Sequence, residues 1–415
     1  MSESRGEDTH DVLLVDFLTG GHHYEYAAEV RDRLRSRGHG VDFLGPAPTD
    51  QYQKFLGPDA SFLFDADDGF VDRLDNQPDV ARTEAVERFY DRPLGEYDVV
   101  HFLAADTILE HLVRRYDGRL LPSIVLSLNG SFFRHVSFED APLTVVSNRL
   151  FETVGGQCYP IRNNFPTLNR ALRNGPASHV TVPTAPALER VESVFDRDLK
   201  GRVSLAPDPA VSWEGTHSDP KSAKQALGVT TDQPMLLYFG QMRAEKGIEL
   251  LVDALKQYTG SPATVVLAGS PTDIDPEFLQ DVRNEHLQTV VHDEFVPQER
   301  VQMYFAAADA VVFPYRESFG RERPSGVFQK TCAAHRPVVV PSFGMFQRAV
   351  TEYNVGVSFE PGDADDLAEQ LASVVADIEL MTETADFEGY CRIHSYDYLA
   401  SQFESVYDRV TLDDQ

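Results

Sequence analysis

The sequence predicts an α/β fold with two domains, each built around a parallel β-sheet. Short apolar runs recur along the chain without polar alternation, which is typical of strands that are covered on both faces. Stretches with a single apolar stripe follow many of these runs and predict helices that connect parallel strands. A polar, proline-containing segment separates the two halves. At 415 residues the chain has the length of two or three domains.

The first half contains the pattern of one parallel sheet. The predicted strands are residues 12–17, 40–44, 99–103, 124–128, 180–182 and 203–205. The predicted helices are residues 24–37, 106–116 and 186–195. Residues 48–95 and 155–177 are polar and poorly periodic, so we expect loops and short helices there.

The second half repeats this alternation after a linker. Strands are expected at 236–239, 309–313 and 337–340, with helices from 248, over 297–307, from 324 and over 396–410. Three prolines mark the connecting segment. The sequence thus predicts a first domain over 1–206, a linker over 207–222, a second domain over 223–388 and a C-terminal helical segment over 389–415.

The stretch LLYFGQMRAEKG, residues 236–247, predicts an anion site. A buried strand ends at Gly240, two cations follow at Arg243 and Lys246, and Gly247 lets a ligand approach the backbone. A helix begins directly after this loop, and its N-terminal amides favour negative charge. The alternative is a solvated pair of cations in an ordinary connecting loop.

A second block supports the anion site. Residues 293–345 contain the strand AADAVVFP, the acidic loop PYRE with Glu317, the helix start SGV, the turn A-x-x-R-P-V-V and a late Gly344. Together with G-x-x-R-x-x-K-G, these motifs resemble the donor domain of retaining GT-B glycosyltransferases, specifically glycosyltransferase family 4. The resemblance implies two Rossmann-like domains that face each other across a cleft, with a C-terminal helix that crosses back to the first domain.

The resemblance also implies an activity and its residues. A retaining hexosyltransferase would move a sugar from a nucleoside-diphosphate sugar to a glycan, lipid-linked or small-molecule acceptor, without a metal or other cofactor. Arg243, Lys246 and Glu317 would be catalytic. Further contacts with the donor would come from Gly240, Gly247, Ser325, Gly326, Val327 and Lys330. Lys330 stands where many family members have a second acid that binds the ribose.

On the acceptor side, the resemblance points to two loops of the first domain. Gly20 and Gly21 match the glycine loop after the first strand, and His22 and His23 follow at the same strand end. Asn129 and Gly130 stand where the family commonly has His-Gly, so proton transfer by residue 129 is not expected. His101 and His135 fit structural roles equally well.

The net charge limits the partners. The chain has 37 basic and 66 acidic residues, a formal charge of −29, and only seven of its cations are lysines. Such a surface argues against nucleic-acid binding, which needs cations that neutralise phosphates. Its acidity and scarcity of lysine are typical of cytosolic proteins from salt-accumulating organisms, and we infer a halophilic archaeal source.

Further features concern location. Three distant cysteines predict neither a disulfide framework nor a zinc site. The polar N-terminus is unlike a signal peptide, and apolar runs are too short to span a bilayer, so a cytoplasmic protein is expected. Four arginines crowd the end of the first predicted helix: Arg31, Arg33, Arg35 and Arg37. They fit cations near a helix C-terminus better than a peripheral contact with the inner membrane face, which stays the alternative.

Two other functions remain open. The first is a GT-B sugar-nucleotide epimerase or phosphorylase, although the donor motifs match the transferases better. The second is a non-catalytic nucleotide-sugar binding protein, which Lys330 and Asn129 keep under consideration. Release of nucleoside diphosphate without an acceptor separates catalysis from binding alone.

Overall fold

The computed structural model divides the chain into two compact units. Unit 1 comprises residues 1–207, 322–324 and 396–415, and unit 2 comprises residues 208–321 and 325–395. The structure describes residues 9–18, 23–130, 132–133, 151–154, 157–160, 165–210, 219–272, 274–275, 277, 279 and 282–412. The predicted residues Gly20, Gly21, His22 and His135 lie outside these ranges.

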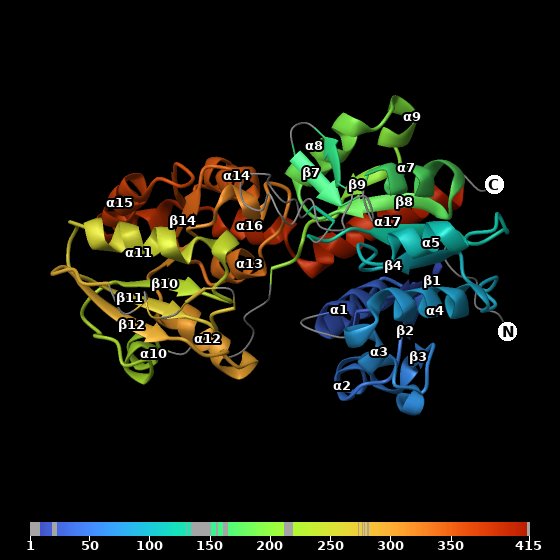
Figure 1. The fold of residues 1–415 in the computed structure, drawn as a ribbon, viewed down its shortest axis with the longest axis horizontal. Coiled ribbons are helices and arrows are strands. Elements are labelled where there is room, and N and C mark those ends of the chain that lie inside the picture. Colours follow the sequence, from blue (N-terminus) through green and yellow to red (C-terminus); the bar gives the residue numbers. More distant parts are fainter. Residues whose placement is uncertain are drawn as a thin grey trace. The chain divides into compact units, whose positions relative to one another are not determined.

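Unit 1 is built on a seven-stranded parallel sheet with the order β3-β2-β1-β4-β5-β8-β9 (Figure 1). Its strands are β3 (Ala60–Phe62), β2 (Gly40–Gly45), β1 (Asp11–Val15), β4 (Val99–Phe102), β5 (Ser123–Ser127), β8 (Ala177–Val182) and β9 (Val203–Leu205). Its main helices are α1 (His23–Ser36), α2 (Asp50–Leu56), α3 (Phe70–Asn76), α4 (Pro78–Tyr90), α5 (Leu109–Arg115), α7 (Phe165–Asn174), α8 (Ala185–Val194), α9 (Arg197–Lys200) and α17 (Tyr396–Leu412). A separate hairpin joins β6 (Phe151–Val154) to β7 (Gln157–Pro160).

Unit 2 contains a six-stranded parallel sheet with the order β12-β11-β10-β13-β14-β15. Its strands are β12 (Leu287–His292), β11 (Ala263–Ala268), β10 (Met235–Phe239), β13 (Ala310–Val312), β14 (Val338–Pro341) and β15 (Gly356–Phe359). Its helices are α10 (Pro220–Ala226), α11 (Ile248–Gln257), α12 (Gln298–Ala307), α13 (Gly326–Ala333), α14 (Gly344–Tyr353), α15 (Ala364–Thr384) and α16 (Phe387–Ile393). These two parallel sheets confirm the predicted fold class.

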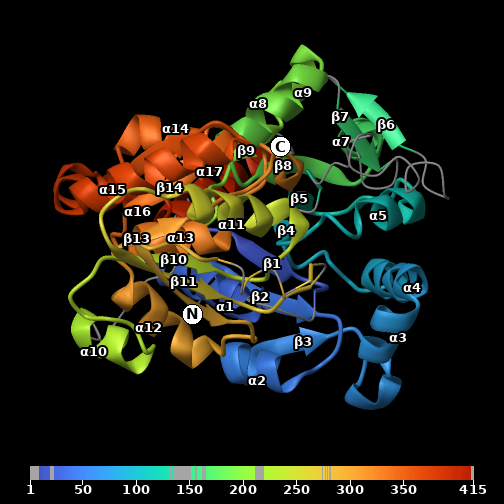
Figure 2. The ribbon, with the colours of Figure 1, turned by 60° about the vertical axis from the view of Figure 1, so that its left-hand side comes forward.

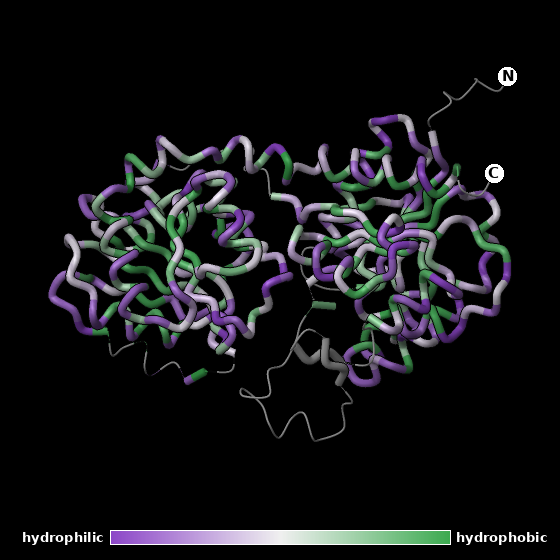
Figure 3. The backbone as a smooth tube through the Cα atoms, turned by 90° about the horizontal axis from the view of Figure 1, so that it is seen from above, coloured by the Kyte–Doolittle hydropathy of each residue, from purple (hydrophilic) through white to green (hydrophobic). Residues whose placement is uncertain are grey.

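Each sheet has helices on both faces, which explains the unalternated apolar strands. In β1, Leu13 and Val15 face one apolar core, whereas Val12 and Leu14 face the other. In unit 2, α11 and α15 cover one face together, and α12, α13, α14 and α16 contribute to the other core (Figure 2). Apolar stretches run through the middle of each unit in Figure 3.

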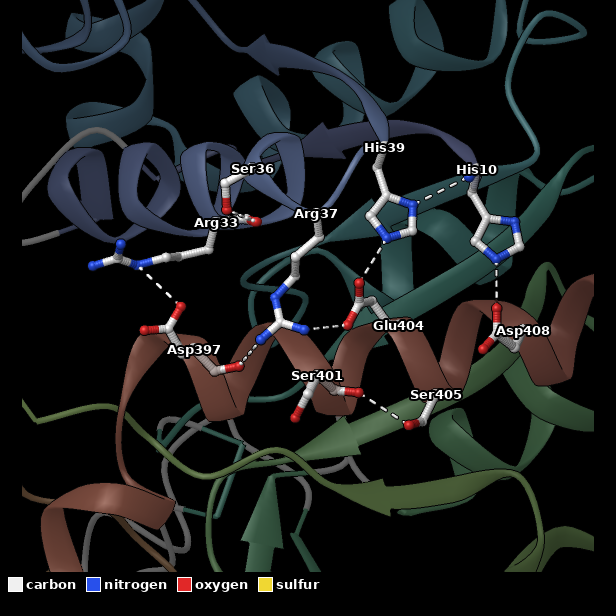
Figure 4. A network of polar contacts seen from close by, with 10 residues as sticks. All are labelled: His10, Arg33, Ser36, Arg37, His39, Asp397, Ser401, Glu404, Ser405 and Asp408. Carbon is white, nitrogen blue, oxygen red and sulfur yellow. Dashed lines mark hydrogen bonds and ion pairs between the residues drawn. The ribbon is translucent and has the colours of Figure 1, made fainter. Parts of the chain in front are cut away.

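The last helix, α17, packs on unit 1. Leu399, Phe403 and Tyr407 share a core with α1 and β1. Figure 4 shows the polar contacts beside this core: Arg37 donates to Glu404 at 2.6 Å, and His39 Nε2 lies 3.0 Å from the same carboxylate. Because His39 Nδ1 accepts the His10 N–H, Nε2 is the nitrogen that donates to Glu404.

The arginine cluster at the end of α1 is engaged in contacts within unit 1. Arg31 donates to the Leu56 carbonyl, and Arg35 donates twice to the Val41 carbonyl. Arg33 lies 3.6 Å from Asp397, and Arg37 also donates to the Asp397 carbonyl. Arg33 and Arg37 thus hold α17, whereas Arg31 and Arg35 hold α2 and β2.

The region expected to hold only loops and short helices contains the 13-residue helix α4. That expectation was wrong because alanines form part of its apolar stripe. Ala81, Ala85, Val86 and Phe89 are all buried, yet small side chains give a weak amphipathic signal.

In the part of the chain that the structure describes, every helix is too short or too polar to cross a bilayer.

Candidate functional site

The predicted donor loops meet at one place in unit 2. β10 and β13 are neighbours in the middle of the sheet, and the chain proceeds from them toward opposite edges. Ligands of open parallel sheets bind at such a switch point, outside the carboxyl ends of the strands. The loop after β10 carries Arg243 and Lys246, and the loop after β13 carries Glu317.

Lys246 lies over the glycine that ends β10. Gly240 has φ +112°, and a Cβ built there would lie 3.2 Å from Lys246 Nζ and 3.5 Å from Val327 Cγ2. The ammonium also lies 5.6 Å from the centre of the Tyr315 ring. Glycine therefore makes room for a cation that an aromatic face helps to hold. The structure brings together the predicted residues Gly240, Lys246 and Val327.

Gly247 allows the loop after β10 to pack closely against the loop after β13. Its φ is +66°, and an added Cβ would lie 1.8 Å from the Pro314 carbonyl oxygen. The Arg316 N–H donates to the Glu245 carbonyl at 3.0 Å. The loops after β10 and β13 are thus in direct backbone contact, which fixes the stem of Lys246.

Arg243 and Glu317 make contacts with their own neighbours. Arg243 caps the short 3₁₀ helix η3 (Ala244–Lys246), and its guanidinium pairs with Gln241 and lies 3.6 Å from Glu245. Glu317 begins the 3₁₀ turn η5 (Glu317–Phe319) and pairs with Arg321, and both side chains are more than half exposed. Neither has a described contact with the Lys246 ammonium.

The N-terminus of α13 adds backbone amides to this region. Ser325 is its N-cap, with Oγ accepting the Phe328 N–H at 3.4 Å. Gly326 is exposed, and a Cβ there would meet nothing within 4 Å. A helix N-terminus whose first residue leaves open space is suited to an anion. Lys330 lies one turn further along α13, where it is half-buried.

The second predicted loop, after β5, is held by an acid that the sequence analysis did not identify. Asp106 Oδ2 accepts the Asn129 N–H at 2.6 Å, and Oδ1 accepts the Phe132 N–H at 2.5 Å. The Asn129 side chain donates to the Leu103 carbonyl at 3.4 Å. This arrangement presents Gly130 between two fixed amides.

A second acid that the sequence analysis missed follows β1. Asp16 is 2 % exposed, accepts the Leu18 N–H at 2.9 Å, and lies 3.3 Å from His23 Nδ1. One signal was available in the sequence: both Asp16 and Asp106 come shortly after an apolar strand, where a functional loop begins.

Metal-binding geometry was sought among the described residues. They contain no group of three or more His, Cys, Asp or Glu side chains arranged to hold an ion.

Comparisons with known proteins bear on the fold and on part of the sequence. Across its whole length the chain resembles solved structures of the GT-B fold. Sucrose-phosphate synthase from Thermosynechococcus elongatus matches with a TM-score of 0.64 and 16 % identity, over 97 % of this chain and 99 % of that one. HepE of Anabaena in complex with UDP and glucose matches with a TM-score of 0.64 and 15 % identity, over 96 % and 100 %. The protein therefore has the GT-B fold.

Part of the second unit matches a family model. Residues 219–386 match the model of the family Glycosyl transferases group 1. A glycosyltransferase of Methanocaldococcus jannaschii is 29 % identical over 48 % of this chain and 50 % of its own length. D-inositol 3-phosphate glycosyltransferase of Xylanimonas cellulosilytica is 30 % identical over 37 % of each chain. The second unit is thus similar in sequence to glycosyl transferases group 1 over residues 219–386.

These sequence matches are partial. The chain spans about half the length of the curated relatives it matches first.

Proposed function

We propose that the protein is a glycosyltransferase that moves a hexosyl group from a nucleoside-diphosphate sugar to an acceptor hydroxyl, with retention of configuration. The observation that carries this proposal is the Lys246 ammonium, held over Gly240 beside Val327 at the start of α13. One fixed cation and the amides of a helix N-terminus then face the same region.

This geometry suits the charge that develops during transfer. The bond between the anomeric carbon and the diphosphate breaks, and its electron pair leaves with the phosphate oxygen. Preorganised cations and amides stabilise that charge more in the transition state than in the ground state. Arg243 would add a second cation after release from Gln241, and Glu317 would accept hydrogen bonds from sugar hydroxyls.

Retention is supported by the resemblance to glycosyltransferase family 4. In a front-face reaction the departing phosphate accepts the proton of the acceptor hydroxyl, so no side chain has to act as a base. The test is release of nucleoside diphosphate from UDP- and ADP-sugars, followed by NMR assignment of the anomeric product. Inverted product would overturn retention, and complete absence of release would overturn transfer.

A non-catalytic nucleotide-sugar binding protein is the second candidate. Lys330 and Asn129 favour it, because they stand where many family members have an acid and a histidine. Binding of the donor in a thermal shift assay without any release of nucleoside diphosphate would support this candidate. Release with or without acceptor would exclude it.

The acceptor is proposed to be a glycan, a lipid-linked sugar or a small molecule. The contacts of Arg33 and Arg37 with α17 favour a structural role for these arginines over a membrane contact. A cytoplasmic location, with or without peripheral membrane contact, stays part of the proposal. Comparison of a soluble glycoside with the same sugar on a lipid in vesicles tests whether a membrane is needed.

A further inference from the structure

Two buried acids follow neighbouring strands of the first sheet. β1 and β4 pair from Val12↔Val99 to Val15↔Phe102 at the centre of the sheet. Asp16 follows β1 and Asp106 follows β4, and they are 2 % and 5 % exposed. Carboxylates are seldom buried without partners, because leaving water costs a charged group heavily. The hydrogen-bond partners of the two carboxylates therefore indicate the role of each acid.

Both carboxylate oxygens of Asp106 accept hydrogen bonds from the loop after β5. The bonds to the Asn129 and Phe132 N–H groups, at 2.6 and 2.5 Å, are short and charge-assisted. The Ala105 N–H also donates to the Ser127 carbonyl at 2.9 Å, which joins the two loops through the backbone. The loop that carries Asn129 and Gly130 is thus set by a side chain from the neighbouring strand end.

We propose that Asp106 is a positioning residue for the acceptor. By holding two backbone N–H groups, it fixes the Asn129 side chain and the Gly130 backbone where they meet a hydroxyl of an uncharged sugar acceptor. The inference rests on the proposed function, in which unit 1 binds the acceptor.

The test compares two carboxylates that flank β4 at its opposite ends. Asp106→Asn replaces one acceptor oxygen by a donor, so one loop N–H loses its partner. Asp98 precedes β4, and its Oδ2 accepts the Asp11 N–H at 2.8 Å at the opposite end of the sheet. Asp98→Asn therefore makes the same carboxylate-to-amide change far from the acceptor loops, and its amide oxygen can still accept the one bond.

Kinetics are measured with UDP-glucose and the best acceptor among glucose, galactose, mannose and their octyl glycosides. We expect Asp106→Asn to lower kcat/KM for the acceptor by roughly 10- to 100-fold, because small misplacements of a positioning group cost that much. The donor KM and donor hydrolysis without acceptor should change less than twofold. Hydrogen exchange of peptides covering residues 128–133 should become faster in this variant. Asp98→Asn should leave all four quantities as in the wild type.

Several results would overturn the inference. Equal acceptor kinetics for the two variants, or an equal loss of donor hydrolysis in Asp106→Asn, would contradict it. The inference would also fail if wild-type protein hydrolyses the donor but transfers sugar to none of the acceptors in the panel. If wild-type protein neither hydrolyses the donor nor transfers its sugar, the proposed function fails together with this inference. Should Asp106→Asn not fold, Asn129→Ala must reproduce the acceptor defect.

Discussion

Lys246 is the residue on which the proposed chemistry depends most. Its ammonium is held at Gly240 and Tyr315, where it can neutralise charge on a departing diphosphate. We expect Lys246→Ala to lower turnover at saturating donor by about 100-fold, as loss of one preorganised donor typically does. Lys256→Ala is the matched control, because that lysine is half-exposed on α11 and pairs only with Asp253 at 3.7 Å. Unchanged turnover in Lys246→Ala would refute the assignment.

Glu317 and Lys330 separate sugar recognition from nucleotide recognition. Glu317→Gln should cripple transfer, since the exposed carboxylate would no longer accept two sugar hydroxyls. Lys330→Ala should mainly change the affinity for, or preference among, UDP-, ADP- and GDP-sugars. Glu352→Gln serves as control, because Glu352 forms a similar pair with Arg348 on α14. Near-wild-type kinetics for both test variants would contradict this division.

At the scale of elements, two left-handed glycines differ in what surrounds them. Gly247 and Gly228 have φ of +66° and +71°, but only Gly247 has backbone within reach of an added Cβ. We expect Gly228→Ala to cost about 1–2 kcal/mol in unfolding free energy, the usual price of left-handed backbone. Gly247→Ala should cost more and also raise the donor KM, because the Pro314 loop must move. Equal losses in denaturant unfolding would show that the loop contact is unimportant.

The contacts of α17 with His101 should make the stability of unit 1 depend on pH. Tyr407 and His101 Nδ1 lie 2.7 Å apart, and His101 Nε2 lies 2.7 Å from Ser127 Oγ. Burial lowers the pKa of His101 to about 3. The pKa of this histidine in the unfolded chain is about 6.5. Below that pH the unfolded chain binds a proton that the folded chain does not, so the free energy of unfolding decreases as the pH is lowered.

This dependence can be measured by unfolding in urea at pH 7 and pH 5. At pH 5 the wild type should lose roughly 2 kcal/mol through His101, at about 1.4 kcal/mol per pH unit. His101→Gln should remove that part of the loss, and His286→Gln, at an exposed position, should not. Parallel pH profiles for wild type and His101→Gln would contradict a neutral, buried His101.

The elements show which features a sequence can reveal. Buried strands such as β10 were predictable, because both faces of the sheet are covered and apolar residues run without interruption. The turn after β10 was predictable because its glycines mark it, whereas the role of this loop in donor binding stays a prediction. Helix α4 was missed because alanines occupy part of its apolar face, which weakens the amphipathic pattern in the sequence. Asp106 was missed because its partners, Asn129 and Phe132, come from another strand, and only the strand order brings them together.

At the scale of the whole molecule, the net charge of −29 should set the response to salt. The Debye length falls from roughly 30 Å at 0.01 M to about 3 Å at 1 M, so salt screens the self-repulsion of the folded chain. We expect the unfolding temperature to rise between 0.1 M and 3 M potassium chloride. Turnover should be maintained or increase, while the donor KM rises because salt also weakens the attraction of Lys246 for an anion.

The measurement pairs thermal unfolding with donor kinetics across that salt range. Sodium glutamate at equal ionic strength is a control for an effect of chloride itself. Greatest stability at the lowest salt would exclude the halophilic interpretation, and the acidity would then need a cationic partner as its explanation.

The chain completes its first unit last. Unit 2 is contiguous between residues 208 and 395 apart from a three-residue excursion, whereas unit 1 needs Tyr396–Gln415 to close the core beside β1. At about 5–20 residues per second, the ribosome makes α17 many seconds after β9. During that interval the core that α1 and α2 form beside the first sheet lacks Phe403 and Tyr407. We therefore expect the first unit to complete its folding after the second, which is the reverse of their order in the sequence.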